Sequence, residues 1–339
     1  MSLEPGRSST PSGTETALVG SLPLRRDPRF LSDLIAVLFM GFIAAVASAL
    51  GAIYILFPEL GALSWDVFGR PRGRWAAAPL MLALTPALTG TLGTVVTRSL
   101  PYGFVSVMLI VAGSVGIIAA LDSPIAPAIS AGLLPLVLGV TSWLYPPGIL
   151  FGSTLLAALS IPWQRRMLAR DAALEPPIEC DSAEGSSAPP AQRWLTALLS
   201  FVLVAELAVR ITGMRFILFP PLVVILYEML RHPGDCPWTG NTVRLPIVCF
   251  IAAAGGYFFH AHIGFVPLAA IVSMAWGVAT LRATRVHVPP ALAVALLPMV
   301  MSRATIGYPV AVGLGTTLAS LWYVGFARWT LRANAASEV

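Results

Sequence analysis

The sequence predicts an all-α membrane protein: a polytopic helix bundle of two tandem repeats, with about eight spanning helices and additional half-helices broken by proline. Three observations predict this class. Of the 339 residues, 57% are hydrophobic and only 11% are charged, with a mean hydropathy of +0.81, whereas about a quarter of the residues in a soluble domain are charged. Apolar runs long enough to cross a bilayer recur along the chain, and short landmarks of the first half return in the second.

This composition excludes a cytosolic enzyme, a secreted disulfide scaffold and a disordered protein. The net charge of +5 does not indicate nucleic-acid binding, because the arginines stand singly or in small groups at the ends of apolar runs, where they act as topology signals. The expected partner is therefore the lipid bilayer. Cys180, Cys236 and Cys249 are odd in number and lack CxxC spacing, so they predict neither a zinc site nor a disulfide framework.

The chain divides into four parts. Residues 1–30, rich in Ser, Thr, Pro and Gly, predict a disordered cytoplasmic tail, and residues 162–193 predict a polar linker. The linker separates membrane repeat 1, residues 31–161, from membrane repeat 2, residues 194–330. The apolar runs that can span lie at about 34–57, 76–97, 103–121 and 145–161 in the first repeat, and at about 194–219, 244–261, 263–281 and 305–326 in the second.

The repeat is visible as short motifs in the same order in both halves. Ile-Leu-Phe-Pro at 55–58 recurs 162 positions later at 217–220. After a slip of one residue, the Leu-Leu-Pro and Tyr-Pro motifs of the first half recur 163 positions later in the second, at 133–135 and 296–298 and at 145–146 and 308–309. Several landmarks in one order are not expected by chance, so the sequence predicts a tandem duplication.

Each repeat also contains two apolar segments that begin at a proline and are too short to span. They lie at 58–68 and 127–140 in the first repeat and at 220–230 and 290–301 in the second. Proline favours the backbone geometry of the first helical turn. Because it has no N–H group, it cannot donate the hydrogen bond that would continue a helix from the preceding turn. We therefore expect half-helices that begin inside the protein, where broken backbone is sheltered from lipid or lines a wet cavity.

Arginine placement predicts the orientation. Arginines flank the first span, the linker and the last span, which places the N-terminus, the linker and the C-terminus on the cytoplasmic side of a bacterial inner membrane. An even number of crossings per repeat follows. Four full spans per repeat, the expected number, leave Arg70, Arg72 and Arg74 facing outward, whereas six crossings place them inside.

One stretch of the second repeat resembles a known family. It reads His287-Val-Pro289-Pro290-Ala-Leu-Ala-Val-Ala-Leu-Leu-Pro298, and Phe-Pro-Glu-Leu-Gly-Ala stands at 57–62. The pattern is similar to the HPP family of integral membrane proteins, with its His-Pro-Pro and Ala-Leu-Leu-Pro signature, although here His287 lies one residue earlier than in the family. The resemblance implies a membrane transporter, with nitrite as the substrate proposed for plastid and cyanobacterial relatives.

The same stretch predicts an anion site from its residues alone. Pro289 and Pro290 place a helix N-terminus beside Arg282, Arg285 and His287, and free N–H groups with the positive end of a helix dipole attract anions. Pro127 starts the matching half-helix of the first repeat. The alternative is that the arginines are interfacial anchors and the histidine is a solvated loop residue.

Two acidic residues occupy matched positions in the two repeats. Asp66 and Glu228 each follow an aromatic residue after the proline break, and carboxyl groups inside apolar stretches are candidates for ion coupling. The alternative is a simple ion pair with Arg70 or Arg231, respectively. We assign no metal site.

Three other polar features receive simpler interpretations. Glu206 and Arg210, four residues apart, are expected to neutralise each other on one helix face. Glu59 is buried by its context, and its counterpart in the second repeat is Pro221. His260 and His262, two positions apart, form a poor metal pair because they point to different sides of a helix.

The function that fits these features is a transporter or permease for a small solute, a small anion by preference, with its path between the repeats. One alternative is an exporter of amphipathic compounds, whose path Trp143, Trp276 and Tyr308 would line; another is a non-transporting membrane scaffold. The sequence contains no Gly-rich phosphate loop or HExxH motif, so we expect no enzyme and no cofactor. It leaves open whether the chain forms a homo-oligomer.

Overall fold

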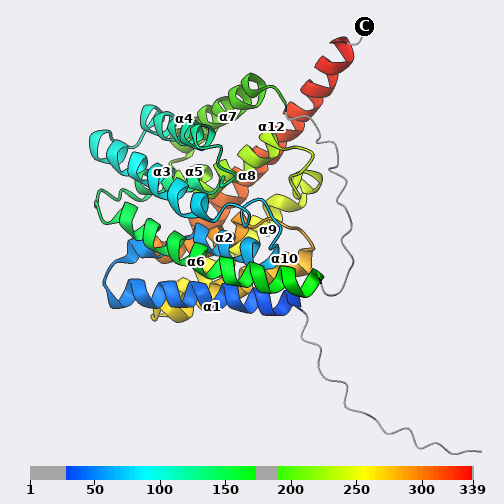
Figure 1. Ribbon diagram of the computed structural model, residues 1–339. Coiled ribbons are helices and arrows are strands. Elements are labelled where there is room, and N and C mark those ends of the chain that lie inside the picture. The colour runs from blue at the N-terminus through cyan, green and yellow to red at the C-terminus, as the bar shows by residue number, and fades with distance from the viewer. Residues whose placement is uncertain (1–27, 173–188, 338–339) are drawn as a thin grey trace, which may run out of the picture.

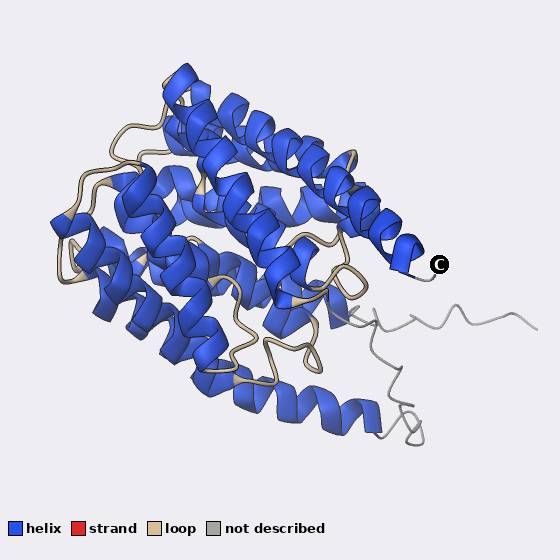
Figure 2. Cartoon of the chain, turned by 90° about the horizontal axis from the view of Figure 1, so that it is seen from above, coloured by secondary structure: helices blue, strands red, loops and turns tan. Residues whose placement is uncertain are grey.

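The computed structural model describes residues 28–172 and 189–337, and within these ranges every regular element is a helix (Figures 1 and 2). This confirms the predicted all-α bundle. The first half contains α1 (Pro28–Ala49), α2 (Glu59–Gly69), α3 (Pro79–Ser99), α4 (Phe104–Ala120), α5 (Ala128–Leu138) and α6 (Tyr145–Ala172). The second half contains α7 (Ala191–Thr212), α8 (Pro220–Arg231), α9 (Arg244–His262), α10 (Val266–Thr284), α11 (Pro290–Leu296) and α12 (Gly307–Ser337).

Short 3-10 turns interrupt this order, and two of them lie at corresponding places in the two halves. The turn η1 (Ile53–Ile55) precedes α2, and η2 (Arg215–Leu218) precedes α8. A third, η3 (Thr239–Asn241), precedes α9, and η4 (Leu297–Val300) extends α11. The helix order of the first half thus recurs in the second: a long helix, a short one, two longer ones, a short one and a final long helix.

Seven described helices are long and apolar enough to cross a bilayer, as in a multi-pass membrane protein: α1, α3, α6, α7, α9, α10 and α12. The eighth expected span, at 103–121, forms α4, which has only 17 residues. At 1.5 Å per residue a helix of this length falls a few ångströms short of the ~30 Å hydrocarbon core. The expected linker also begins later, since α6 continues past residue 161 to Ala172; the tail at 1–27 and the linker residues 173–188 lie outside the described residues.

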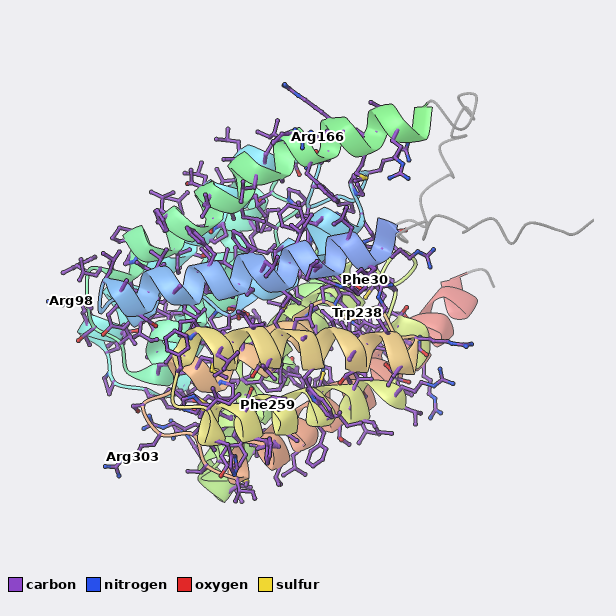
Figure 3. All side chains as sticks on the ribbon, turned by 90° about the horizontal axis from the view of Figure 1, so that it is seen from below. Phe30, Arg98, Arg166, Trp238, Phe259 and Arg303 are labelled. Carbon is purple, nitrogen blue, oxygen red and sulfur yellow. The ribbon has the colours of Figure 1, made fainter. Side chains whose placement is uncertain are left out.

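The four short helices α2, α5, α8 and α11 form the interior of the bundle. Nearly all of their residues are buried, as expected for helices that are mainly apolar. Short helices of one half pack on short helices of the other, α2 against α11 and α5 against α8, while the long α1 lies beside α10 (Figure 3). The core is therefore built from both halves.

Proline inside two of these short helices is compensated by tyrosine. Pro135 and Pro298 have no N–H, so the carbonyls four residues earlier, of Ala131 and Val294, lose their helical donor. The hydroxyl of Tyr145 donates to the Ala131 carbonyl at 2.8 Å, and that of Tyr308 donates to the Val294 carbonyl at 2.6 Å. Both tyrosines are fully buried. The recurring Tyr-Pro landmark thus supplies the hydrogen bond that the recurring Leu-Leu-Pro landmark removes.

Replacing Tyr308 by phenylalanine is expected to lower the free energy of unfolding by about 1–3 kcal/mol, because the buried Val294 carbonyl would lose its partner. The measurement is thermal unfolding of the purified protein in detergent. Tyr257→Phe is the control, because no hydrogen bond of the Tyr257 hydroxyl is seen among the described residues. Equal unfolding midpoints for the two variants would contradict the compensation.

The arginines after α2 lie at a different end of the bundle from the one that the predicted topology gives them. Trp163 of α6 donates to the Phe68 carbonyl at 2.9 Å, and Trp65 of α2 donates to Asp33 of α1 at 2.7 Å. The loop after α2 therefore lies at the end of the bundle where α1 begins and α6 ends. We call this the arginine-rich end; Arg98 and Arg303 lie at the opposite end (Figure 3).

Arg70, Arg72 and Arg74 therefore share one end with the start of the first span, which differs from the arrangement expected for four spans per repeat and agrees with the alternative of six crossings. The reason is that the chain passes along the bundle six times in each half, since the short helices and their connecting segments also count as passes. The even number of passes is retained. Which side of the membrane the arginine-rich end faces stays a prediction.

Candidate functional site

The predicted anion-binding residues meet at a pocket at the arginine-rich end. Its volume is about 400 Å³, and its lining includes Arg29, Arg282, Arg285 and His287 together with Trp65. Arg282 lies in the last turn of α10 and Arg285 follows that helix in a left-handed conformation, with φ +55°. We call this cavity the arginine pocket. It combines residues of the second half with α1 and α2 of the first.

Asp33 of α1 orders one wall of the arginine pocket. Arg282 donates to it from Nη2 at 2.8 Å and from Nε at 3.0 Å, and the Trp65 indole N–H donates to it as well. The Arg282 guanidinium also lies 5.6 Å from the centre of the Trp65 ring, within reach of a cation–π interaction. Two-point bonding of this kind fixes the plane of the guanidinium. The charge of Asp33 is thereby offset by Arg282.

His287 connects the arginine pocket to a second cavity. Its ring stacks on Trp65, with centroids 4.8 Å apart, and its Nε2 lies 3.1 Å from Oδ1 of Asp66. Asp66 also accepts hydrogen bonds from Arg70, four residues along the chain. The predicted Asp66–Arg70 ion pair is therefore confirmed, and Asp66 in addition bridges to the second half of the chain through His287.

The second cavity, which we call the vestibule, has a volume of about 220 Å³ and is lined by the loops that follow α2 and α8. The matched carboxyl groups of Asp66 and Glu228 both face it, and both are almost completely buried. The other charged or titratable lining residues are Arg70, Arg72, Arg74, His232, Asp235 and Cys236. The vestibule thus joins equivalent segments of the two halves.

The ion pair expected between Glu228 and Arg231 is not the contact that Arg231 makes. Arg231 hydrogen-bonds the Tyr227 hydroxyl and lies 5.7 Å from the Trp194 ring centre. Glu228 lines the vestibule together with Arg74, which comes from the other half. The nearest arginine in the sequence is therefore not the only cation that shares a cavity with Glu228.

His232 in the vestibule is held in its neutral form. Burial lowers its pKa to about 4 from the usual 6.5, and the charges of Arg74 and Arg231 act in the same direction. The Arg74 Nη2 lies 3.2 Å from His232 Nε2, so the neutral ring can accept a hydrogen bond from the guanidinium. Asp235 opposes the shift.

We expect the free energy of unfolding to fall as the pH is lowered from about 6.5 to about 4. Over this range the histidine of the unfolded chain takes up a proton, whereas that of the folded chain does not, so protons favour the unfolded state. Replacing His232 by glutamine should make the unfolding midpoint less sensitive to pH in this window. An unchanged pH dependence in thermal unfolding of the variant would contradict the assignment.

The helix N-terminus predicted at Pro289 and Pro290 is not an open anion site. The α-helical part of α11 has only seven residues, and both prolines are buried. The Ala291 N–H donates to the Val288 carbonyl at 3.0 Å, and the Leu292 N–H donates to the Pro289 carbonyl at 2.9 Å. Tight turn bonds thus use the donors that the prediction required, and arginine side chains provide the positive charge.

Pro127 is likewise not part of the site. It is buried at the N-cap of α5, and the Ala128 N–H after it donates to the Ile125 carbonyl at 3.2 Å. Asp122 stands where the second half has Arg285, and both have positive φ, +45° and +55°. The backbone turn therefore recurs while the charge is reversed, which makes the arginine pocket specific to one half.

Sequence reasoning missed Arg29, Asp33, Trp65, Arg74 and His232. Asp33 and Arg282 are 249 positions apart, and Arg74 and His232 are 158 apart, so no local pattern links them. The one signal that the sequence offered for these residues was the aromatic residue directly before each of the matched carboxyl groups, Asp66 and Glu228.

Other predicted features lie away from this site. Arg210 is 3.7 Å from Glu206, as expected for a pair on one helix face, and Tyr102 of the first half also donates to Glu206 at 3.0 Å. Cys236 and Cys249 are buried free thiols, and Cys180 lies outside the described residues. In the described part of the chain, no three or more acidic, His or Cys side chains come together in a way that could hold a metal ion.

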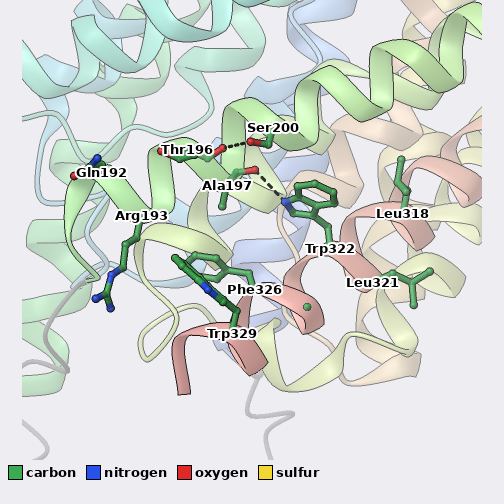
Figure 4. A pocket seen from close by; sticks show the side chains of 11 residues that line it. Gln192, Arg193, Thr196, Ala197, Ser200, Leu318, Leu321, Trp322, Phe326 and Trp329 are labelled. Atoms are coloured by element: carbon green, nitrogen blue, oxygen red, sulfur yellow. Dashed lines mark hydrogen bonds between the residues drawn. The ribbon is translucent and has the colours of Figure 1, made fainter. Parts of the chain in front are cut away.

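A larger cavity of about 800 Å³ is a groove between α7 and α12 (Figure 4). Its lining is mainly apolar and includes Trp322, Phe326 and Trp329, and Arg193 is its charged member. A similar groove of about 580 Å³ lies between α1 and α6. Because these are the first and last helices of each half and lie on the outside of the bundle, the grooves are unsuited to binding a small ion.

The aromatic residues proposed for an amphipathic path do not come together. Trp143 lies under Arg98 at 5.2 Å, Trp276 donates to the Ile251 carbonyl at 2.9 Å, and Tyr308 is buried against α11. They occupy three different places in the bundle.

Comparison of the chain with protein-family models, with curated proteins and with solved structures gives no match.

Proposed function

We propose that the chain is a membrane permease for a small inorganic anion, which enters at the arginine-rich end. The observation that carries this proposal is the arginine pocket, where Arg29, Arg282 and Arg285 surround about 400 Å³ together with His287. Asp33 forms an ion pair with Arg282 of this group. Guanidinium groups are suited to planar oxyanions because they donate in a fixed fork. An excess of positive charge also raises the local concentration of anions.

The path is proposed to continue from the arginine pocket into the vestibule between the halves. His287 contacts both cavities through Trp65 and Asp66. The recurring helix order, the Tyr145 and Tyr308 hydrogen bonds and the left-handed Asp122 and Arg285 support a tandem duplication. Two related halves that meet around short broken helices are the arrangement of many transporters.

The resemblance of the 287–298 stretch to the HPP family supports the same class and makes nitrite the first anion to test. Purified protein in liposomes should admit nitrite faster than protein-free liposomes, as followed by an anion-sensitive dye inside. Admission of sodium or of an uncharged sugar at the same rate would show a leak and overturn the proposal. Absence of any flux, with the protein monodisperse and inserted, would also overturn it.

The apolar groove between α7 and α12 is the observation that favours the alternative, an exporter of amphipathic compounds. The same liposomes can be loaded with a fluorescent amphipathic dye. Protein-dependent loss of the dye without nitrite flux would favour this alternative.

A further inference from the structure

Glu59 is a buried carboxyl group that the proposed anion path does not use. It lies in the first turn of α2, is 1% exposed, and neither carboxyl oxygen has a hydrogen-bond partner. No ion pair seen among the described residues includes it. An intramembrane carboxyl group without a partner is costly in its ionised form and is a candidate for function.

The groups around Glu59 come from both halves and offer no cation. Ser130 of α5 is the side chain that acts on Glu59 as a hydrogen-bonding group, and the Ser130 hydroxyl, like the Glu59 carboxyl oxygens, has no hydrogen-bond partner among the described residues. Tyr145 of α6 and Tyr308 of α12 are close enough to interact with its charge, but their hydroxyls are bonded to the carbonyls of α5 and α11. On the adjoining side, Gly61 packs against Leu296 of α11. Nothing in this surrounding neutralises a carboxylate.

We propose that Glu59 is a proton-binding site at the centre of the bundle. A proton added to the carboxylate oxygen removes the charge and creates an O–H group, which can donate to the Ser130 hydroxyl. A metal cation would instead require several oxygen ligands, and one carboxyl group with one hydroxyl does not supply them. The second half has Pro221 at this place, so each chain has one site.

Glu59 and the vestibule residue Asp66 lie on the same face of α2. Asp66 follows Glu59 by seven residues, which is two helical turns, so both carboxyl groups lie on one side of α2 about 10 Å apart along its axis. Asp66 lines the vestibule. A proton that enters at the arginine-rich end therefore has a titratable group at each end of α2.

Coupling of this proton to anion movement rests on the proposed permease function, whereas proton binding does not. A proton carried with a monovalent anion would make transport electroneutral. The dependence of flux on a pH gradient is then assigned to Glu59, and anion entry is assigned to the arginines.

Infrared difference spectroscopy of the reconstituted protein tests proton binding directly. When the pH is changed between about 5 and 9, the protein should gain and lose the carbonyl-stretch band of a protonated buried carboxyl group. Glu228 is a second buried carboxyl group, so the comparison is made in a Glu228→Gln background. In that background Glu59→Gln should remove the band, and Glu59→Asp should retain it at a shifted frequency. Asp66→Asn in the same background is the matched control that should keep it.

Three outcomes would overturn the proposal: no titrating band in Glu228→Gln, a band that persists when Glu59→Gln is added to Glu228→Gln, or a signal in Glu228→Gln that follows sodium concentration at fixed pH. Gln is isosteric with a protonated Glu, and a monodisperse elution profile checks that the variant is folded. Intact nitrite flux without a titrating band would overturn only the proton site. A titrating band without flux would overturn only the permease.

Discussion

Replacing Gly256 of α9 by alanine is expected to destabilise the protein strongly, although it adds only one methyl group. A Cβ atom at this position would lie 2.0 Å from the carbonyl oxygen of Ala295 in α11. The first half has the same crossing, where a Cβ at Gly93 of α3 would lie 1.9 Å from the carbonyl oxygen of Gly132 in α5. Glycine lets these helix backbones touch, as small residues do in membrane helix packing.

Gly256→Ala is expected to lower the free energy of unfolding by more than the ~1–3 kcal/mol typical of overpacking, because the clashing atom belongs to the backbone and cannot rotate away. Gly116→Ala in α4 is the matched control, since a Cβ there meets nothing within 4 Å. Alanine favours a helix over glycine by about 1 kcal/mol, so the control should be neutral or slightly stabilised. Thermal unfolding and yield of monodisperse protein measure both variants.

A lower unfolding midpoint for Gly256→Ala, together with an unchanged or higher midpoint for Gly116→Ala, would support the close crossing of α9 and α11. A Gly256→Ala protein with wild-type stability would contradict it, because α11 would then be able to move away from α9. Gly93→Ala should behave like Gly256→Ala, which makes the test repeatable in the first half.

The proline positions made the interior of the fold predictable. Pro58, Pro127, Pro220 and Pro290 each stand at the start of a short buried helix, as expected from the constraint that proline places on the first turn. The spans were predictable from hydropathy, because helix length must match the bilayer. The number of passes was not, since a short helix and an extended connection together cross the bundle without forming an apolar run of spanning length.

The candidate site was predictable only in part. The residues Arg282, Arg285 and His287 were found because they stand together before a proline, and they do line one pocket. Their partners Asp33 and Trp65 come from the start of the chain, and a single sequence gives no signal for such distant contacts. The helix-dipole argument failed because turn hydrogen bonds occupy the N–H groups of α11.

Replacing Arg285 by glutamate is expected to lower nitrite flux by at least tenfold in liposomes. Arg285 is exposed at the arginine pocket, and no ion pair of its side chain is seen among the described residues, so its charge is available to an anion. Reversal changes the charge by two units, and a difference of ~1.4 kcal/mol between the two proteins already corresponds to a factor of ten. Arg282→Glu should have a similar effect on flux but should also lower stability, because it would place a second carboxylate beside Asp33.

The control is Arg303→Glu, which makes the same change in net charge at the opposite end of the bundle (Figure 3). Because exposed charges separated by more than about 10 Å are largely screened at ~0.1 M salt, Arg303→Glu should leave entry at the arginine-rich end nearly unchanged. A fall of equal size in both variants would mean that the overall charge controls flux, and unchanged flux in Arg285→Glu would exclude the arginine pocket as the entry site. Raising the salt concentration should narrow the difference between the wild type and Arg285→Glu, since screening weakens the attraction that the reversal removes.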